Sequence, residues 1–554
     1  DHYGRPGFAR VLLSVARAWL ERRGEVERAA GELTEQLRSM GSVPASPGPL
    51  DEGLLDDAAR HLARVYDPRY GGFGSAPKFL HAMDLKVLLR AYARTGDQHA
   101  LQMVRHTLEM MARGGIYDHL GGGFSRYSTD ERWLVPHFEK MLYDNALMIS
   151  VYVEAYQVTK DETYATIARE TIDYVLGRMT DTEGPFHATE DADSEGVEGK
   201  YYVWGLAEVV AVLGEEKAKT FAYVYDVSQG GNWEHQNILN MPKALDQAAM
   251  ALGRDVDDLR RELAEGRAAL LKVRDRRVPP GKDTKVLASW NGLMIAALAS
   301  AAHVLDVTEY HRAAERAADF VLAKMRGPDG LLFHAYRDGR ARFQGCLDDY
   351  AALIDGLTRL FEANGEERHV RAALELADVM AAEFADPEGG FFFTGNRHEP
   401  LIARQKDVYD NATPSGNSLA ATALARLAAL TGREDLRRLA WDSLAAARLV
   451  LEKAPAAAGQ AFIALEVLLS PPRELAVFTG SNAAETAAVL RRVYRDFHPE
   501  QVVAPAWRTP SEDLTRLVPL LAGRGAIDGK VALYVCERFA CAAPLVGGEA
   551  FDDR

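Results

Sequence analysis

Short glycine-rich turns that carry aromatic residues recur along this chain, and they set the order of its helices. They are RYGGFGS near residue 70, DHLGGGFSRYS at 118, EGPFHATED at 183, DGLLFHAYRDG at 329 and EGGFFFTG at 388. Between these turns, apolar residues repeat with the period of an amphipathic helix. A recurring unit of helix, short turn, helix and longer loop is typical of helical repeat folds.

The helical segments form pairs, and the pairs predict the fold class. Periodicity predicts helices at 7–39, 51–66, 82–95, 97–113, 137–158, 161–179, 244–274, 291–305, 308–326, 348–363, 367–385, 415–431, 433–453 and 456–469. Six pairs begin near residues 82, 138, 203, 291, 348 and 415, and SQGGNWEHQNIL at 228 interrupts the third pair. Because short connections make neighbouring helices antiparallel, we expect a mainly α fold, an (α/α)6 barrel with its long loops at one end.

The pattern changes after SPPREL at residue 470. ELAVFTG, a helix near 483–496, QVVAPAW and VALYVC are typical of strand, helix, strand and strand. We therefore expect three parts: a helical segment at 1–45, the barrel at 46–470, and a small α/β lobe at 471–554.

The net charge of −15 excludes some functions and disfavours others. Nucleic-acid binding needs clustered Lys and Arg, so no nucleic-acid partner is expected. No apolar run is long enough to span a bilayer and no signal peptide is evident, so no membrane association is predicted. Three cysteines, Cys346, Cys536 and Cys541, give no disulfide framework. The simplest interpretation is a cytoplasmic protein.

The starts of the inner helices carry polar groups that a barrel would bring together around one cavity. VPHFEKMLYDNAL at 135 has ionisable groups within eight positions. An acidic, aromatic and amide-rich cavity suits a small polyhydroxylated ligand such as a sugar. The candidate catalytic residues are His137, Glu139, Asp193 and Asp349. The candidate substrate-binding residues are Lys78, Arg126, Trp290, Asn291, Tyr350, Asp410, Asn411, Ser415 and Asn417.

Several of these residues have a structural alternative. Glu139 after Pro136 fits ordinary helix-start chemistry, and His137 fits a hydrogen-bonded structural histidine. One of Asp348 and Asp349 is expected to cap its helix, which leaves Asp349 as the residue that points inward. Trp290 fits a core position as well as a stacking platform.

Three further motifs favour no cofactor and no metal. DADSEGVEG at 191 resembles half a calcium loop but lacks the terminal bidentate glutamate, so a solvated acidic turn is expected. GGGF carries neither a phosphate-loop lysine nor a preceding strand, so nucleotide binding is not expected there. CERFAC at 536 is C-x4-C rather than C-x-x-C, and we expect two small buried thiols there.

Several motifs together identify a family resemblance. GGGFSRYSTDERWLVPHFEKMLYDNALM, EDADSEGVEGKYYVW, GNWEHQNIL, LASWNGLMIAALA, LDDYAALIDGL, YDNATPSGNS and YVCERFACAAP resemble, in order, the thioredoxin-domain-containing family that includes spermatogenesis-associated protein 20 and bacterial homologues. The resemblance implies a thioredoxin-like domain before residue 1, with residues 1–45 as the segment that follows it. It also implies a middle region similar to six-hairpin glycosidases and to N-acylglucosamine 2-epimerases. His235 and Gln236 depart from the Gly-Lys of relatives.

Two functions stay open at this point. The first is an enzyme that acts on a carbohydrate. Hydrolysis would use two carboxyl groups, such as Asp193 or Glu195 with Asp349, whereas epimerisation would use an acid and a base. His137 is then one candidate, with a second histidine from His119, His187, His235 or His334. The other function is a binding scaffold that presents a client to the thioredoxin-like domain.

Overall fold

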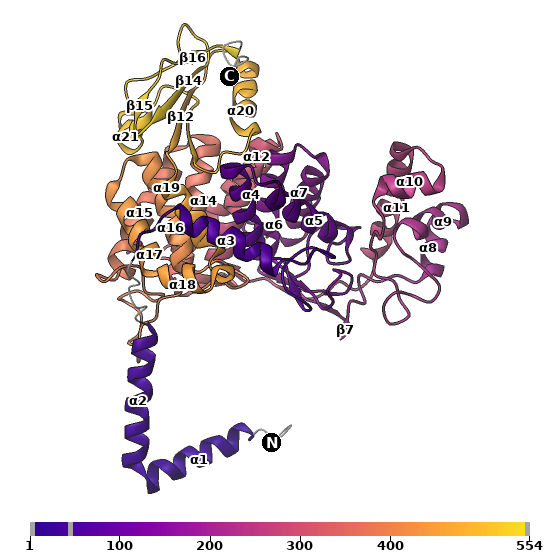
Figure 1. The fold of residues 1–554 in the computed structure, drawn as a ribbon, viewed down its shortest axis with the longest axis horizontal. Coiled ribbons are helices and arrows are strands. Elements are labelled where there is room, and N and C mark those ends of the chain that lie inside the picture. Colours follow the sequence, from indigo (N-terminus) through magenta and orange to yellow (C-terminus); the bar gives the residue numbers. More distant parts are fainter. Residues whose placement is uncertain (1–5, 42–47, 549–554) are drawn as a thin grey trace.

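A ring of helices forms the body of the molecule (Figure 1). The computed structural model describes residues 6–41 and 48–548, so the expected boundary at 45 lies outside the described residues. Two amphipathic helices at the N-terminal end, α1 (Phe8–Glu21) and α2 (Arg23–Gly41), extend away from the body (Figure 1). The sequence predicted one helix there, but the backbone leaves the helical region at Arg22.

Within residues 48–548, six inner helices close into a ring. Each packs against the next, and the last packs against the first. In ring order they are α4 (Ala82–Thr95), α6 (Leu142–Thr159), α12 (Ala288–Val304), α14 (Leu347–Asn364), α16 (Gly416–Thr431) and α19 (Gly459–Leu469). Some are apolar on nearly every side, as in the LMIAALASAA segment of α12, because both faces are covered by other helices. The predicted (α/α)6 barrel is confirmed.

The outer helices follow the inner ones in short antiparallel hairpins, with one exception. They are α5 (Gln98–Arg113), α7 (Glu162–Tyr174), α13 (Thr308–Lys324), α15 (Glu367–Phe384), α17 (Glu434–Ala446) and α3 (Glu52–Val65). The pair expected near residue 203 was wrong, since no helix of that region packs into the ring. The sixth pair instead consists of α19 and α3, which pack together although they lie far apart in the sequence.

The recurring glycine-aromatic turns are held by asparagines on the inner helices. In three repeats an asparagine in the first turn of an inner helix accepts the backbone N–H of an aromatic residue and donates to the backbone oxygen of the same residue, at 2.7–3.1 Å. The pairs are Asn145–Phe124, Asn291–Phe186 and Asn417–Phe391. Because buried backbone groups need partners, these side chains fix each loop to its inner helix.

A buried lysine neutralises the aspartate of each of three such turns. Lys140 is 2.8 Å from Asp118 and donates to the backbone oxygen of Gly122 at 2.9 Å. Lys78 makes the same contacts with Asp67 and Gly71, and Lys406 makes them with Asp386 and Gly389. A buried charge needs such a partner, so the lysine and the aspartate form one unit of the repeat.

The segment before α6 is extended rather than helical. Pro136–His137 forms β3, which pairs with β2 (Tyr127–Ser128), and Lys140–Met141 forms β4, which pairs with β5 (Thr189–Glu190). The expected helix start at Pro136 was therefore wrong, since the backbone of 136–141 belongs to two small sheets.

The interrupted region between α7 and α12 forms a separate helical lobe beside the barrel (Figure 1). It contains α8 (Leu206–Leu213), α9 (Glu215–Val224), α10 (Leu245–Leu252) and α11 (Val256–Arg274). These helices share a hydrophobic core of their own, which includes Trp204, Phe221 and Leu263.

The predicted C-terminal α/β lobe is confirmed. β12 (Arg473–Phe478) pairs in parallel with β13 (Gln501–Ala506) through α20 (Ala483–Arg495), and antiparallel with β14 (Ala532–Glu537). Cys536 and Cys541 face each other across a hairpin and form a disulfide. The expectation of two small buried thiols was therefore wrong, because the strand register places the two cysteines directly opposite each other.

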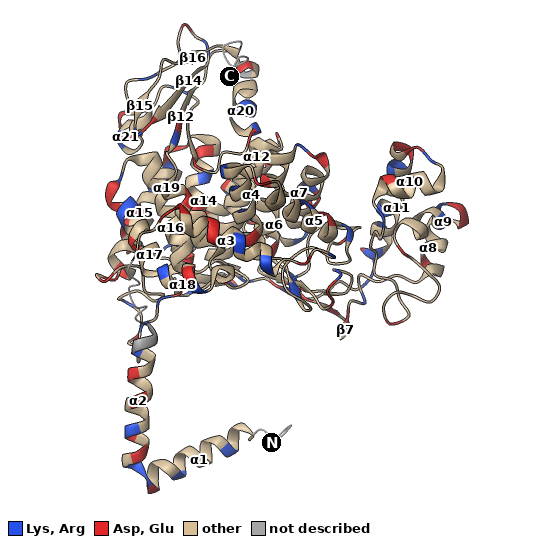
Figure 2. Cartoon of the chain, viewed as in Figure 1, with Lys and Arg blue, Asp and Glu red and all other residues tan. Residues whose placement is uncertain are grey.

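The surface carries charges of both signs. Figure 2 shows acidic and basic segments interspersed along the helices of the barrel and on α1 and α2. Among the helices of the described residues, none is long and apolar enough to cross a membrane. The cytoplasmic location stays a prediction.

Candidate functional site

A cavity of about 410 Å³ opens where four inner helices begin. The first turns of α4 and α6, the loop before α16 and the start of α19 line it. Phe79, Met83 and Leu147 supply apolar wall. Its polar wall consists of His81, Asp84, Arg126, Asp144, Asp410 and Asn411. Three carboxyl groups on a partly apolar wall, with an arginine and an amide, are typical of a small-molecule site.

Asp144 is a buried carboxyl group on the third residue of α6. It is 6% exposed, and its Oδ2 has no hydrogen-bond partner within residues 6–41 and 48–548. Burial raises the pKa of Asp144 well above its usual value, and Glu139 adds to this, while Arg126 opposes it. Burial in this setting favours the protonated form of the carboxyl group.

Asp84 holds the equivalent position on α4, in a different setting. Its Oδ2 lies 2.9 Å from Nδ1 of His81, the residue immediately before the helix, whereas its Oδ1 is buried without a partner in the described chain. Burial raises the pKa of Asp84, and the hydrogen bond with His81 opposes the rise. His81 therefore favours the ionised form of Asp84, whereas the pKa of Asp144 stays well above its usual value despite Arg126 and Tyr143.

Asp410 ties two inner-helix starts together. Its Oδ1 accepts the N–H of Ser415 at 2.8 Å, and its Oδ2 accepts the N–H of Gln460 at 2.7 Å. Burial raises its pKa to about 7, with a contribution from Asp84. Asp410 therefore positions α16 and α19 and adds a third acidic group to the wall.

An acidic and an aromatic side chain lie at the starts of the next two inner helices, Asp348 on α14 and Trp290 on α12. Residues Asp355, Arg359 and Glu362 of α14 point into the barrel interior. Asp348 lies two turns before Asp355 on the same helical stripe, so it faces the same interior. Its Oδ1 is buried without a partner among the described residues, and burial, followed by the charge of Asp349, raises its pKa. On α12, Trp290 meets Tyr143 of α6 edge to face at 4.8 Å.

A chain of ionic contacts leads from the cavity to the surface. Nη1 of Arg126 is 3.4 Å from Oε2 of Glu139, which is 3.6 Å from Nε2 of His137. Nδ1 of His137 is 2.7 Å from Oε1 of Glu198, and its ring stacks on Tyr127. The structure therefore places His137 and Glu139 at the rim, with Arg126 as their link to the cavity.

The cavity wall contains Arg126, Asp410 and Asn411 of the residues proposed from sequence. Trp290 lies partly buried at the start of α12. Asp193, by contrast, is exposed in the β6–β7 hairpin (Asp193–Ser194 and Val197–Glu198). It lies among the solvated carboxylates of that turn.

Other proposed residues are engaged in holding the fold. Asn291 and Asn417 hold the glycine-aromatic turns, and Lys78 neutralises Asp67, as described above. The hydroxyl of Tyr350 accepts the N–H of Leu332 at 2.8 Å, which repeats the role of the asparagines. Ser415 caps α16 through the N–H of Ser418.

Asp349 is completely buried and accepts several hydrogen bonds. It accepts the N–H of Ser289 at 3.0 Å and that of Cys346 at 2.9 Å, and it lies 2.8 Å from Nδ1 of His334. Cys346, Asp348 and Asp349 have potential metal-ligand atoms within 4.8 Å of one another. Because Asp349 is already engaged on both oxygens, this group fits a capping carboxylate beside an acidic side chain.

Sequence reasoning missed His81, Asp84 and Asp144, although their signal is present. HAMDLK at 81 and LYDNAL at 142 each place an aspartate on the third residue of an inner helix. A helix-start aspartate is normally solvated or capping. Only the closed ring buries these two.

The fold and the cavity define the class: an (α/α)6-barrel protein with a carboxyl-lined pocket at the starts of its inner helices. The chain belongs to the spermatogenesis-associated protein 20 family. The human protein of that name is 33% identical over 98% of this chain and 75% of its own length. The rat protein is 31% identical over 98% of this chain and 74% of its own.

No family model matches the chain. Among solved structures, D-mannose isomerase is 13% identical with a TM-score of 0.46, and the match covers 73% of this chain and 88% of that one. An inactive α-1,6-mannanase of Salegentibacter sp. HEL1_6, in complex with α-1,6-mannotetrose, is 12% identical with a TM-score of 0.43, covering 76% and 99%. The barrel assignment here rests on the helix packing of this chain.

Proposed function

We propose that the cavity at the inner-helix starts is the active site of a carbohydrate-active enzyme that hydrolyses glycosidic bonds. The observation that carries the proposal is the set of buried carboxyl groups with raised pKa, two of which, Asp84 and Asp144, have an oxygen without a partner in the described chain. Burying such groups is costly. Active sites commonly contain such costly buried groups, because catalysis by a protonated acid requires a raised pKa.

Hydrolysis needs one carboxylic acid to protonate the leaving oxygen and one carboxylate to attack or to activate water. Asp144 fits the acid, because burial raises its pKa well above its usual value even though Arg126 and the hydroxyl of Tyr143 favour the ionised form. Asp84 fits the carboxylate, because its bond to His81 supports the charge. Pairs of carboxyl groups in unlike environments take opposite roles in this way. Phe79 and Met83 supply apolar wall against which a sugar ring could pack.

Epimerisation is the closest alternative chemistry. It needs an acid and a base on opposite faces of one carbon, and His81 is the histidine that lines the cavity. Three carboxyl groups around one histidine favour hydrolysis over epimerisation.

The test uses the purified chain with two substrate panels. One contains oligosaccharides and the other contains simple aldoses and ketoses, and products are followed by chromatography. Release of shorter sugars that is lost in D144N and in D84N supports hydrolysis, and interconversion of monosaccharides supports epimerisation. A folded chain that turns over neither panel overturns the proposal.

A second candidate function is a binding scaffold for an attached thioredoxin-like domain. It is favoured by α1, whose apolar side chains are exposed, as with Phe8 at 78%, Leu13 at 72% and Leu20 at 82%. An exposed apolar face of this kind marks an interaction site. A redox activity of the longer protein that is unchanged in D144N and H137A would support the scaffold over the enzyme.

A further inference from the structure

A second cavity lies inside the barrel, toward the C-terminal ends of α6, α12 and α14. It has a volume of about 130 Å³, well above the roughly 10–15 Å³ that one water needs. The C-terminal lobe closes it, since Tyr494, Phe497, Gln501 and Val503 line it. We call this cavity the chamber. It meets the cavity of the candidate active site only at Leu147, which lines both.

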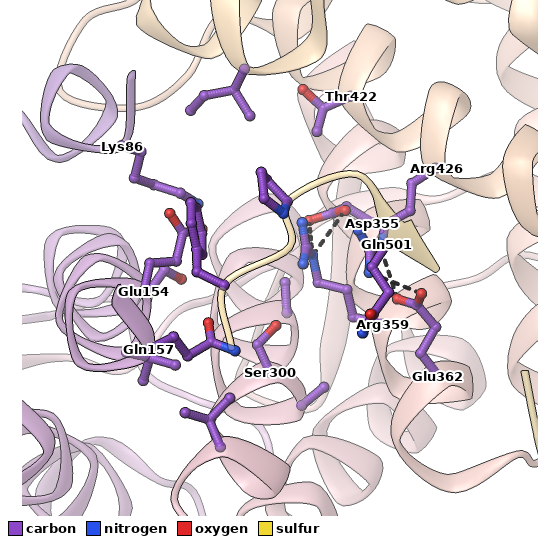
Figure 3. Close-up of a pocket in the computed structure, with 18 of the residues that line it drawn as sticks. Lys86, Glu154, Gln157, Ser300, Asp355, Arg359, Glu362, Thr422, Arg426 and Gln501 are labelled. Carbon is purple, nitrogen blue, oxygen red and sulfur yellow. Dashed lines mark hydrogen bonds and ion pairs between the residues drawn. The ribbon is translucent and has the colours of Figure 1, made fainter. Parts of the chain in front are cut away.

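The chamber is lined by charged side chains from opposite sides of the ring. Figure 3 shows Lys86 and Glu154 on one side, with Asp355, Arg359 and Glu362 across from them. Nζ of Lys86 is 3.1 Å from Glu154, and Nη1 of Arg90 is 2.7 Å from the same carboxylate. Two cations therefore share one carboxylate on the α4–α6 side.

On the opposite side of the chamber, each arginine pairs with one carboxylate. Nε of Arg359 contacts both carboxylate oxygens of Asp355, at 2.9 and 3.1 Å. Arg426 binds Glu362 through Nε and Nη2, and Oε1 of Glu362 also accepts the N–H of Val503 at 3.0 Å. Glu362 is therefore fully engaged, and the guanidinium edge of Arg359 is not.

Several hydrogen-bond donors on residues that line the chamber lack an acceptor, and Oε1 of Gln501 is buried without a donor in the described chain. Within the described chain, Nζ of Lys86 has Glu154 as its partner, Nη1 and Nη2 of Arg359 have no hydrogen-bond acceptor, and Nε of Arg90 is buried without one. Leaving buried donors unpaired costs free energy. A ligand rich in acceptor oxygens would satisfy them.

Like charges also crowd this space. Burial lowers the pKa of the Lys86 ammonium, and the charges of Arg90 and Arg359 lower it further, while Glu154 opposes them. The other nearby carboxylates are held elsewhere. Asp496 at the chamber edge is 2.9 Å from Lys160, and Glu466 behind Arg90 is 3.8 Å from Arg94. An anion between Lys86 and Arg359 would relieve the repulsion.

We propose that the chamber is a binding site for a small oxyanion, a phosphate or a carboxylate, held between Lys86 and Arg359. The free edge of Arg359 presents paired N–H groups at the spacing of two oxyanion oxygens. Lys86 supplies a point charge from the opposite side. The bound ion braces α4 against α14, beneath the lobe.

The test is thermal unfolding and calorimetric titration of the whole chain at constant ionic strength. Inorganic phosphate and acetate are the two probes, and chloride is the reference. A specific site gives a saturable rise in Tm of about 1–3 °C at high occupancy with phosphate, acetate or both. The probe that acts identifies the source of the oxyanion.

Variants locate the effect. K86M and R359Q are expected to abolish the rise. The matched control K285M, which removes an exposed lysine paired with Asp283 outside the chamber, is expected to keep it. The proposal is overturned when neither probe exceeds chloride, or when K86M and R359Q respond as the unmodified chain does. These readouts need no sugar turnover, so they are independent of the proposed hydrolase.

Crystals of the unmodified chain soaked in selenate cover the case in which both variants fail to fold. Selenium scatters anomalously, so a peak between Lys86 and Arg359 supports the site. Selenate bound only at the outer surface contradicts it.

Discussion

Asp144 is a buried carboxyl group whose pKa burial raises well above its usual value, and it carries the first prediction. In the proposed hydrolysis Asp144 is the general acid, a role worth about 10²–10⁴ in rate. The D144N variant keeps the shape and loses the acid, so we expect turnover of a responsive sugar to fall by about that factor with the fold intact. D193N, in an exposed hairpin, is the control. Equal rates for D144N and the unmodified chain would remove Asp144 from the mechanism.

The same carboxyl group predicts how stability changes with pH. The folded chain keeps the Asp144 proton to a higher pH than the unfolded chain does, because burial raises its pKa. Stability is therefore fully present in acid and falls as the pH rises above the ordinary range of an aspartate, by up to about 1.4 kcal/mol per unit for one group.

Denaturant unfolding between pH 4 and 8 measures this slope. D144N is expected to lose less stability over that range than the unmodified chain. Parallel curves for the two proteins would show that Asp144 is ionised in the folded state throughout.

At the residue scale, sequence reasoning located part of the wall and misjudged the surroundings. Arg126, Asp410 and Asn411 were selected and do line the cavity. The amides of Asn291 and Asn417 looked equally available for a ligand. Their partners, Phe186 and Phe391, lie in loops distant in sequence, and no periodicity reveals such a contact.

At the scale of the structural elements, the glycine-aromatic turn held by an asparagine recurs in three repeats of the barrel. N291A removes the acceptor for the N–H of Phe186 and the donor to its oxygen. Because buried backbone groups are then left unpaired, we expect a loss of about 2–3 kcal/mol in the free energy of unfolding.

N396A is the matched control, since Asn396 bonds to Ala382 and Arg404 at the surface. A loss below 1 kcal/mol is expected there from chemical denaturation. If both variants lose the same amount, the turns are held by their own backbone bonds.

The packing of α12 on α14 carries another prediction at this scale. A Cβ on Gly292 would lie 2.5 Å from the backbone carbon of Ala352. Helix propensity alone favours alanine over glycine by about 1 kcal/mol. We expect the clash to outweigh it, so that G292A lowers Tm. G177A, where nothing lies within 4 Å, is the control. A rise in Tm for G292A would show that the two helices move apart freely.

The hairpin pattern could be predicted because it is local. Glycine-aromatic turns and helical periodicity placed five of the six inner-helix starts in the described chain to within three residues, and the start of α6 was placed five residues early, at 137 rather than Leu142. The hairpin that closes the ring could not be found this way. α3 is an ordinary amphipathic helix and α19 is apolar on nearly every side, so neither sequence indicates the other as its partner. Only three-dimensional packing pairs them.

On the scale of the whole molecule, the C-terminal lobe donates a hydrogen bond to a buried ion pair of the barrel. Glu362 binds Arg426 and the N–H of Val503. E362A leaves Arg426 buried and unpaired, for which we expect a loss of about 3–5 kcal/mol, with lobe and barrel unfolding in one transition.

E375A is the control. It breaks an exposed pair with Arg326, for which a loss of less than about 1 kcal/mol is expected. Differential scanning calorimetry distinguishes the outcomes. Two separate transitions in the unmodified chain would contradict a common unfolding unit.

The helix that completes the ring beside α19 is α3, from the other end of the barrel sequence. During synthesis on the ribosome, α3 and α4 emerge long before α19 does. Their apolar faces stay exposed to solvent until α19 has been translated. Contacts between such distant segments slow folding, and exposed apolar surface invites aggregation in the meantime. Nascent chains of this protein are therefore expected to depend on chaperones until translation has passed Leu469.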